Sequence, residues 1–133
     1  ARVWAGDPAQ DEAFLAGVTE RDTPVFVHAS LLVNLGSPTP ATVAHSVATL
    51  RHGLERGAAI GARGVVFHAG SAVDEAHVGP AFGQIRQALL PLLGDLTRRR
   101  LGLLVHEKLL KLPQMMQHWA NCRMRFCLHL VSE

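Results

Sequence analysis

Two apolar segments of this chain end in a histidine that is followed by small residues. One is Val25-Phe26-Val27-His28 and the other is Val65-Val66-Phe67-His68. Short runs rich in β-branched and aromatic residues predict buried parallel strands. Ligands of parallel α/β folds collect at the carboxyl ends of the strands, so the two imidazoles should share one edge of a sheet. No other feature constrains the fold as strongly.

The segments around these strands carry the signals of helices. Asp7-Pro8 and Thr39-Pro40 each combine an N-cap residue with a proline in the first turn, and Asp74-Glu75 is a third acidic start. Helices are therefore expected over residues 8–20, 40–60 and 75–93, with Pro91 kinking or ending the last one. Their expected buried faces are Phe14, Leu15 and Val18, then Val43, Val47, Leu50 and Leu54, then Val78, Phe82, Ile85 and Leu89.

Helices that alternate with strands predict right-handed βαβ units and a parallel sheet. Strands are expected at residues 24–28, 64–68, 101–106 and 124–129. A complete eight-stranded barrel takes about 250 residues. The 133 residues of this chain therefore predict an α/β fold with about half of a TIM barrel, as a fragment of a longer protein.

The composition changes sharply after residue 105. Residues 106–133 contain both Lys, both Cys and all three Met, whereas all 12 Gly precede them. We therefore divide the chain into a partial barrel over residues 1–105 and a divergent tail over residues 106–133. A frameshift or a mis-joined segment would produce such a change.

Charge and cysteine content exclude several classes of protein. The net charge is +2, which excludes a polybasic nucleic-acid tail but not a local phosphate-binding surface. No apolar run is long enough for a membrane span, and we expect no signal peptide. Cys122 and Cys127 do not support a disulfide framework, so a cytoplasmic setting is expected.

The strand-end histidines have two interpretations. Imidazole is the commonest metal ligand, and two imidazoles are half of a tetrahedral zinc shell. Alternatively, each ring caps its strand by bonding a backbone carbonyl. His45 and His52 lie off the expected buried stripe and should face solvent. His77 lies beside Asp74 and Glu75, but acidic residues at a helix start more often serve the helix dipole.

A resemblance to a known family is carried by two strings, His28-Ala29-Ser30-Leu31-Leu32-Val33-Asn34-Leu35-Gly36-Ser37-Pro38 and Phe67-His68-Ala69-Gly70-Ser71. From Arg2 to about Val105 the chain resembles endonuclease IV. That family comprises apurinic/apyrimidinic (AP) DNA-repair endonucleases on a TIM barrel with three zinc ions. The resemblance implies a phosphoric-diester hydrolase of base excision repair that cuts abasic duplex DNA 5′ of the lesion. It also implies that His28 and His68 are zinc ligands.

The resemblance suggests three DNA-binding residues. Arg2 matches an arginine that enters the DNA, and Asn34 should lie on the DNA side. Leu31 stands where the family usually has a tyrosine that opens the DNA at the lesion. An apolar wedge can still unstack bases, so Leu31 is retained as a candidate.

The third strand departs from the family pattern. The family ends it with a metal-bridging glutamate, whereas this chain has His106 followed by Glu107. A shift of one residue turns a strand side chain to the opposite face, so Glu107 is not a simple substitute. His106 becomes the third candidate ligand, and at most one partial zinc site is expected. The family's later Asp and His ligands are replaced by His129 and Ser132, and catalytic residues are not assigned.

Two other functions are compatible with the pattern. One is a metal-dependent sugar isomerase or epimerase of the related barrels, against which the string from Asn34 to Pro38 argues. The other is a non-catalytic remnant. Half a barrel would expose unpaired strand edges, so self-association is also expected.

Overall fold

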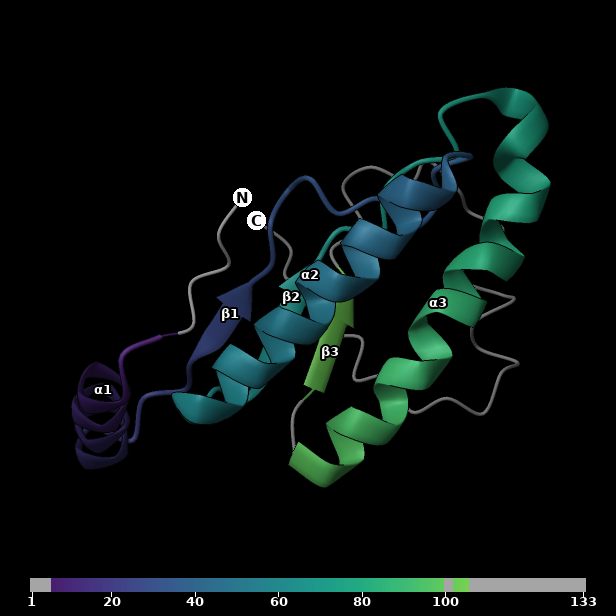
Figure 1. Cartoon of the computed structure of the whole chain (residues 1–133). Helices are drawn as coiled ribbons and strands as arrows, with labels where there is room; N and C mark the ends of the chain where they lie inside the picture. The colour runs from purple at the N-terminus through teal and green to yellow at the C-terminus, as the bar shows by residue number, and fades with distance from the viewer. Residues whose placement is uncertain (1–5, 100–101, 106–133) are drawn as a thin grey trace.

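A three-stranded parallel sheet organises the computed structural model, which describes residues 6–99 and 102–105 (Figure 1). The strands follow the order β1-β2-β3 across the sheet. The elements in chain order are α1 (Pro8–Glu20), β1 (Phe26–His28), α2 (Pro40–Ala59), β2 (Gly64–Phe67), the 3₁₀ turn η1 (Glu75–His77), α3 (Val78–Arg99) and β3 (Gly102–Val105). The predicted α/β fold is confirmed.

Both strand pairings are parallel, as the barrel prediction requires. His28 lies opposite Val66 in the first pair, and Phe67 lies opposite Val105 in the second. α2 connects β1 to β2 and α3 connects β2 to β3, which gives two successive βαβ units. The fourth expected strand, at residues 124–129, lies outside the described residues.

The expected start signals are present at the helices, although they work in different ways. The Asp7 carboxylate accepts the N–H groups of Ala9 and Gln10, which caps α1. Thr39 makes no side-chain cap bond at α2, and its own N–H donates to Ser37 Oγ at 3.1 Å. Asp74 Oδ1 accepts the His77 N–H at 2.8 Å, so Asp74 caps η1 as its position predicted.

The third helix does not end at Pro91 or at residue 93, so its expected end is wrong. The chain first forms η1 and then continues as α3 to Arg99, with Pro91 inside the helix. Pro91 is exposed, whereas its neighbours Leu89 and Leu92 are buried in the core. Packing on both sides of the proline therefore offsets the loss of one helical hydrogen bond.

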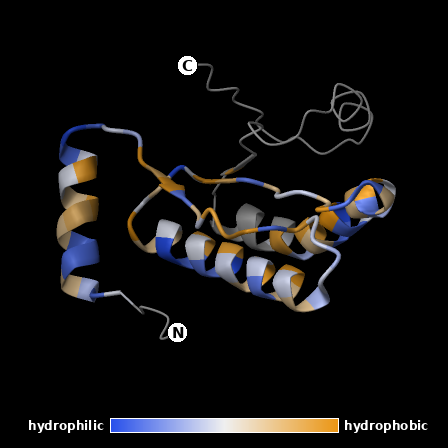
Figure 2. Ribbon diagram, turned by 90° about the horizontal axis from the view of Figure 1, so that it is seen from above, coloured by the Kyte–Doolittle hydropathy of each residue, from blue (hydrophilic) through white to orange (hydrophobic). Residues whose placement is uncertain are grey.

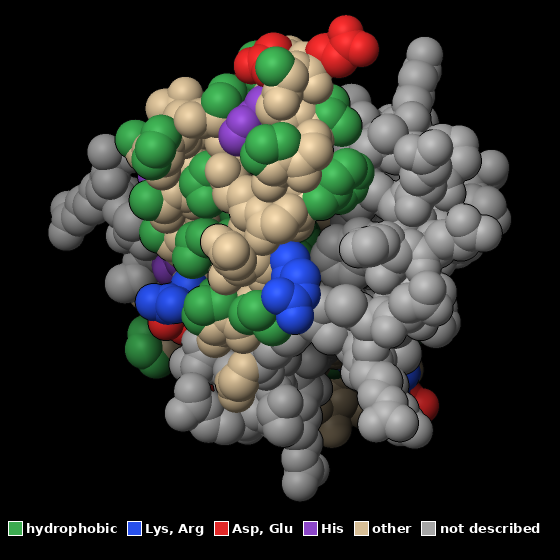
Figure 3. Space-filling model, turned by 90° about the vertical axis from the view of Figure 1, so that its right-hand side faces the viewer, with side chains coloured by type: hydrophobic (Ala, Val, Ile, Leu, Met, Phe, Trp, Pro, Cys, Tyr) green, Lys and Arg blue, Asp and Glu red, His purple; other side chains and the backbone are tan. Residues whose placement is uncertain are grey.

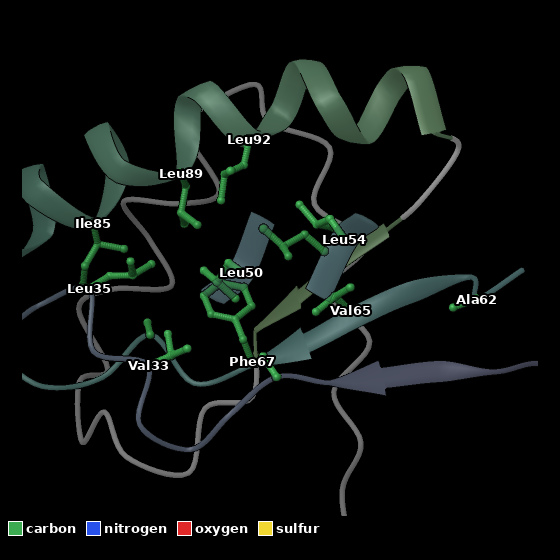
Figure 4. Close-up of a cluster of buried hydrophobic side chains, with 13 residues drawn as sticks. Val33, Leu35, Leu50, Leu54, Ala62, Val65, Phe67, Ile85, Leu89 and Leu92 are labelled. Atoms are coloured by element: carbon green, nitrogen blue, oxygen red, sulfur yellow. The ribbon is translucent and has the colours of Figure 1, made fainter. Parts of the chain in front are cut away.

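One face of the sheet holds the hydrophobic core. In Figure 4, Leu50 from α2 and Leu89 and Leu92 from α3 point towards Val65 and Phe67 of β2. Val65 and Phe67 are completely buried, so this face of β2 is the centre of the packing. Both α2 and α3 thus cover the same side of the sheet.

The buried face of α2 differs in part from the expected stripe. Ser46, Leu50, Leu54 and Gly57 are buried, whereas Val43 and Val47 are only half-buried. A Cβ added at Gly57 would lie 3.6 Å from side-chain atoms of strands β1 and β2. The helix therefore sits close to the sheet at this glycine, and its buried face is shifted accordingly.

The expected buried face of α1 is wrong. No residue of α1 is buried, and Phe14 and Leu15 are 48% and 40% exposed. α1 stands to one side of the sheet (Figure 2), where an ion pair joins Asp11 to Arg56 of α2. The helix has the predicted bounds, but the described residues form no second wall over its apolar side chains.

None of the helices within residues 6–99 is long and apolar enough to cross a membrane. The face shown in Figure 3 carries hydrophobic side chains, with its few described charged groups lying apart. This distribution agrees with the small net charge, because the described part of that face forms no extended basic surface.

Candidate functional site

The two strand-end histidines lie side by side. His28 is the last residue of β1 and pairs with Val66 of β2. His68 follows the end of β2, two residues after Val66. Side chains alternate along a strand, which places both imidazoles on the face opposite Phe67. Their ring centroids are 5.4 Å apart and their planes are inclined by 51°. The predicted juxtaposition is confirmed.

A backbone contact defines the chemistry of the His28 ring. Its Nδ1 lies 2.7 Å from the carbonyl oxygen of Ala29. Because a carbonyl can only accept, Nδ1 must donate, and Nε2 carries the lone pair when the ring is neutral. The strand-capping interpretation and the ligand interpretation are therefore compatible, since each uses a different nitrogen.

The described residues bring two candidate metal ligands together but not three. Residues 6–99 and 102–105 contain no group of three or more His, Cys, Asp and Glu side chains arranged to hold a metal ion. Asp74, Glu75 and His77 therefore form no such cluster. His106, the third predicted ligand, and the neighbouring Glu107 lie outside the described residues.

An exposed apolar pair follows the His28 strand. Leu31 and Leu32 are 74% and 80% exposed, on a turn in which Ser30 Oγ accepts the Leu32 N–H at 3.2 Å. Leu31 was predicted from its position, whereas Leu32 was missed. Leu32 was missed because its exposure depends on how the turn projects from the sheet, which the sequence does not show. Arg2, another predicted DNA-binding residue, lies outside the described residues.

Asn34 lies between the loops that follow the two histidines. Its Oδ1 accepts the N–H of Gly36 at 3.1 Å and the N–H of Ser71 at 3.0 Å. Sequence analysis also missed Gln84 of α3, whose Nε2 donates to the carbonyl oxygens of Leu35 and Ser37 at 2.7 and 2.8 Å. The contact from Asn34 to Ser71 and both contacts of Gln84 join residues far apart in the chain.

A groove of about 550 Å³ runs between α1, α2 and the end of β1. Phe14, His28, Ser30 and His52 are among the residues that line it. His52 is half-buried, so its expected solvent-facing position is corrected, whereas His45 is exposed as predicted. α1 lies beside this part of α2, which the helical periodicity of α2 alone does not reveal.

Successive parallel βαβ units define the class as an α/β barrel of partial length, and solved structures agree. A D-tagatose 3-epimerase-like protein shares the fold, with a TM-score of 0.62 and 14% identity over 75% of this chain and 39% of that protein. A Thermus thermophilus protein soaked with zinc chloride matches with a TM-score of 0.54 and 25% identity, over 76% of this chain and 44% of its own.

Within this class the chain is similar to endonuclease IV. A probable endonuclease 4 of Streptomyces avermitilis is 52% identical over 99 residues, which are 72% of this chain and 32% of that protein. The crystal structure of endonuclease IV from Thermus thermophilus matches with 38% identity and a TM-score of 0.60, over 79% of this chain and 36% of that one. The predicted resemblance is confirmed.

The matched region is one part of a longer fold. The chain spans about a third of the length of the curated relative that it matches. No family model matches the chain. Endonuclease IV enzymes are generally metal-dependent, and one structural neighbour of this chain was soaked with zinc chloride.

Proposed function

We propose that this chain supplies part of the zinc site of an AP endonuclease that acts in base excision repair. The substrate is abasic duplex DNA, and the reaction is hydrolysis of the phosphodiester 5′ of the lesion. The observation that carries the proposal is the pair His28 and His68, whose rings are 5.4 Å apart, in a chain that is 52% identical over 99 residues to a probable endonuclease 4.

The donor chemistry of the pair fits zinc. Two imidazoles bound to one tetrahedral zinc through nitrogens at about 2.0–2.1 Å have ring centroids about 5 Å apart. The observed separation is 5.4 Å, and the Ala29 carbonyl leaves His28 Nε2 as the donor atom. His106 is the proposed third ligand. Bound zinc ions supply Lewis-acid stabilisation and a hydroxide near neutral pH in hydrolases of this kind.

Three residues would contact the proposed DNA substrate: Leu31, Asn34 and Arg2. Exposed Leu31, with Leu32 beside it, would act as an apolar wedge between bases at the lesion. Arg2 would contact a backbone phosphate, which positions the duplex without reading its sequence. Asn34 would contact the DNA through its amide NH₂ group, because its Oδ1 already accepts two backbone N–H groups.

A sugar epimerase is the second candidate, since an epimerase-like protein shares the fold. Identity of 14% with that protein supports the fold alone, whereas a probable endonuclease 4 is 52% identical over 99 residues. The nuclease is therefore favoured. The family uses three zinc ions, whereas this chain offers candidate ligands for at most one partial site, so the 133-residue chain alone should show no detectable nicking.

Zinc titration tests the site. Isothermal titration calorimetry should detect weak binding that falls by about tenfold or more in His68→Ala, because one of few ligands is lost. The matched control is His45→Ala on the exposed face of α2, which should bind zinc like the wild type. Equal affinity in all three proteins would remove the site assignment.

A nicking assay tests the activity. The wild-type chain should leave abasic duplex DNA intact with zinc present, and EDTA should make no difference. Strong nicking that EDTA abolishes would show that this chain alone completes a metal site. Nicking that persists in EDTA would contradict a zinc-dependent reaction.

A further inference from the structure

We infer that Asn34 is a positioning residue that holds the His28 and His68 rings together by fastening one strand-end loop to the other. This inference rests on the proposed ligand role of the two histidines. The Asn34 Oδ1 accepts one N–H from its own loop, at Gly36, and one from the loop after β2, at Ser71. A single oxygen atom therefore links two segments 37 residues apart in the chain.

The two loops are in direct contact around this oxygen. The Leu35 N–H donates to the Ala69 carbonyl at 2.9 Å. Gly70 has φ +88°, and a Cβ at that position would overlap Asn34 Oδ1. A Cβ at Gly36 would lie 3.1 Å from the backbone of Ser71. The small residues after each histidine thus allow the backbones to meet at Asn34.

Asn34 is itself anchored to a helix of the core. Its N–H donates to Ser46 Oγ at 2.9 Å, and that hydroxyl donates to the Thr42 carbonyl at 2.7 Å. Ser46 is buried on α2, so its hydrogen bond with Asn34 fixes the position of the loop relative to the helix that packs on the sheet. The hydrogen bond from the Ser71 N–H to Asn34 Oδ1 then fixes the second loop relative to the first.

The histidines begin the two loops that Asn34 joins. His28 immediately precedes Ala29, whose N–H donates to the Val66 carbonyl at 2.8 Å, and His68 immediately precedes Ala69. The β1–β2 ladder pairs only three residues of each strand, and it ends at His28. The contacts made by Asn34 join the two segments again just beyond the end of the β1–β2 pairing. This second connection limits the movement of the His28 ring relative to the His68 ring.

Substitutions of Asn34 separate acceptor chemistry from side-chain volume. Asn34→Asp keeps an oxygen that accepts both N–H groups, whereas Asn34→Leu has a similar size and no acceptor. Ser71→Ala is the matched control, because it keeps the backbone N–H that Asn34 binds. Asn34→Ala replaces Asn34→Leu should the leucine variant fail to fold.

Two readouts are measured on the full 133-residue chain at a temperature at which every variant is folded. The first is the NMR nuclear Overhauser effect between the ring protons of His28 and His68 without metal, which needs no zinc site. The second is zinc affinity by calorimetry. Asn34→Leu should lose the ring-to-ring signal and bind zinc about tenfold or more weakly, whereas Asn34→Asp and Ser71→Ala should keep both.

The outcomes distinguish this inference from the proposed function. If Asn34→Leu loses the ring-to-ring signal and the wild-type chain binds no zinc, the positioning role is supported and the zinc site is overturned. Zinc binding and a ring-to-ring signal that both survive in Asn34→Leu would overturn the positioning role, even where the melting temperature falls. The zinc site would then stand.

Discussion

The last residue of β2 and the residue that follows it serve opposite faces of the sheet. Phe67 is completely buried against the helices, whereas the next residue, His68, lies on the other face beside His28. Strand alternation thus separates the residue that stabilises the sheet from the residue proposed to bind metal. Changes at the two positions should have separable effects.

The first prediction concerns Phe67. Phe67→Ala should lower the free energy of unfolding by about 3–5 kcal/mol, because it leaves a cavity in the centre of the core. Val66→Ala, at a half-buried position on the opposite face, should cost about 1–2 kcal/mol by the methylene groups it removes. Urea unfolding followed by circular dichroism measures both. Equal losses would contradict the asymmetry of the two faces.

Sequence reasoning located some residues of the site and missed others for a physical reason. His28 and His68 could be predicted because strand ends follow from local composition, and parallel strands share an edge. The half-buried position of His52 could not, since it depends on where α1 lies. The bond from Asn34 to Ser71 spans 37 residues, and no local pattern encodes it.

At the scale of elements, the bounds of α1 were predicted correctly and its buried face was not. Asp7 and Pro8 define the start of this helix by local hydrogen bonding, so the sequence is informative there. Phe14 can be buried only where another element packs against its side of α1. The spacing of apolar residues along the helix predicts which side is apolar, but not whether another element covers it. α3 shows the converse, because its packing carries the helix past a local break signal at Pro91.

The second prediction follows for α3. Pro91→Ala should raise the free energy of unfolding by about 1–3 kcal/mol, because alanine restores a helical hydrogen bond at an exposed position. Gly94→Ala is the matched control: an added Cβ there meets nothing within 4 Å. It should give about 0.5–1 kcal/mol from helix propensity alone. A loss of stability in Pro91→Ala would show that the proline ring fits this helix better than alanine does.

At the scale of the molecule, the described sheet is covered by helices on one face, and β1 is an outer strand in its order. Phe26 on β1 is 51% exposed, on the same face as His28. An outer strand with an exposed aromatic residue offers unpaired backbone groups and apolar surface to a second chain. Self-association through this edge is therefore expected.

The last prediction tests that association by size-exclusion chromatography over a range of protein concentrations. The apparent mass of the wild-type chain should exceed 14.4 kDa and should increase with protein concentration. Phe26→Lys should shift elution towards the monomer, because a charge on an outer strand opposes pairing. Leu90→Lys is the matched control, since Leu90 is a 40% exposed apolar residue on α3, away from β1. It should elute like the wild type. Elution of the wild type as a monomer at every concentration would contradict the expectation, and an equal shift in both variants would place the contact elsewhere than at β1.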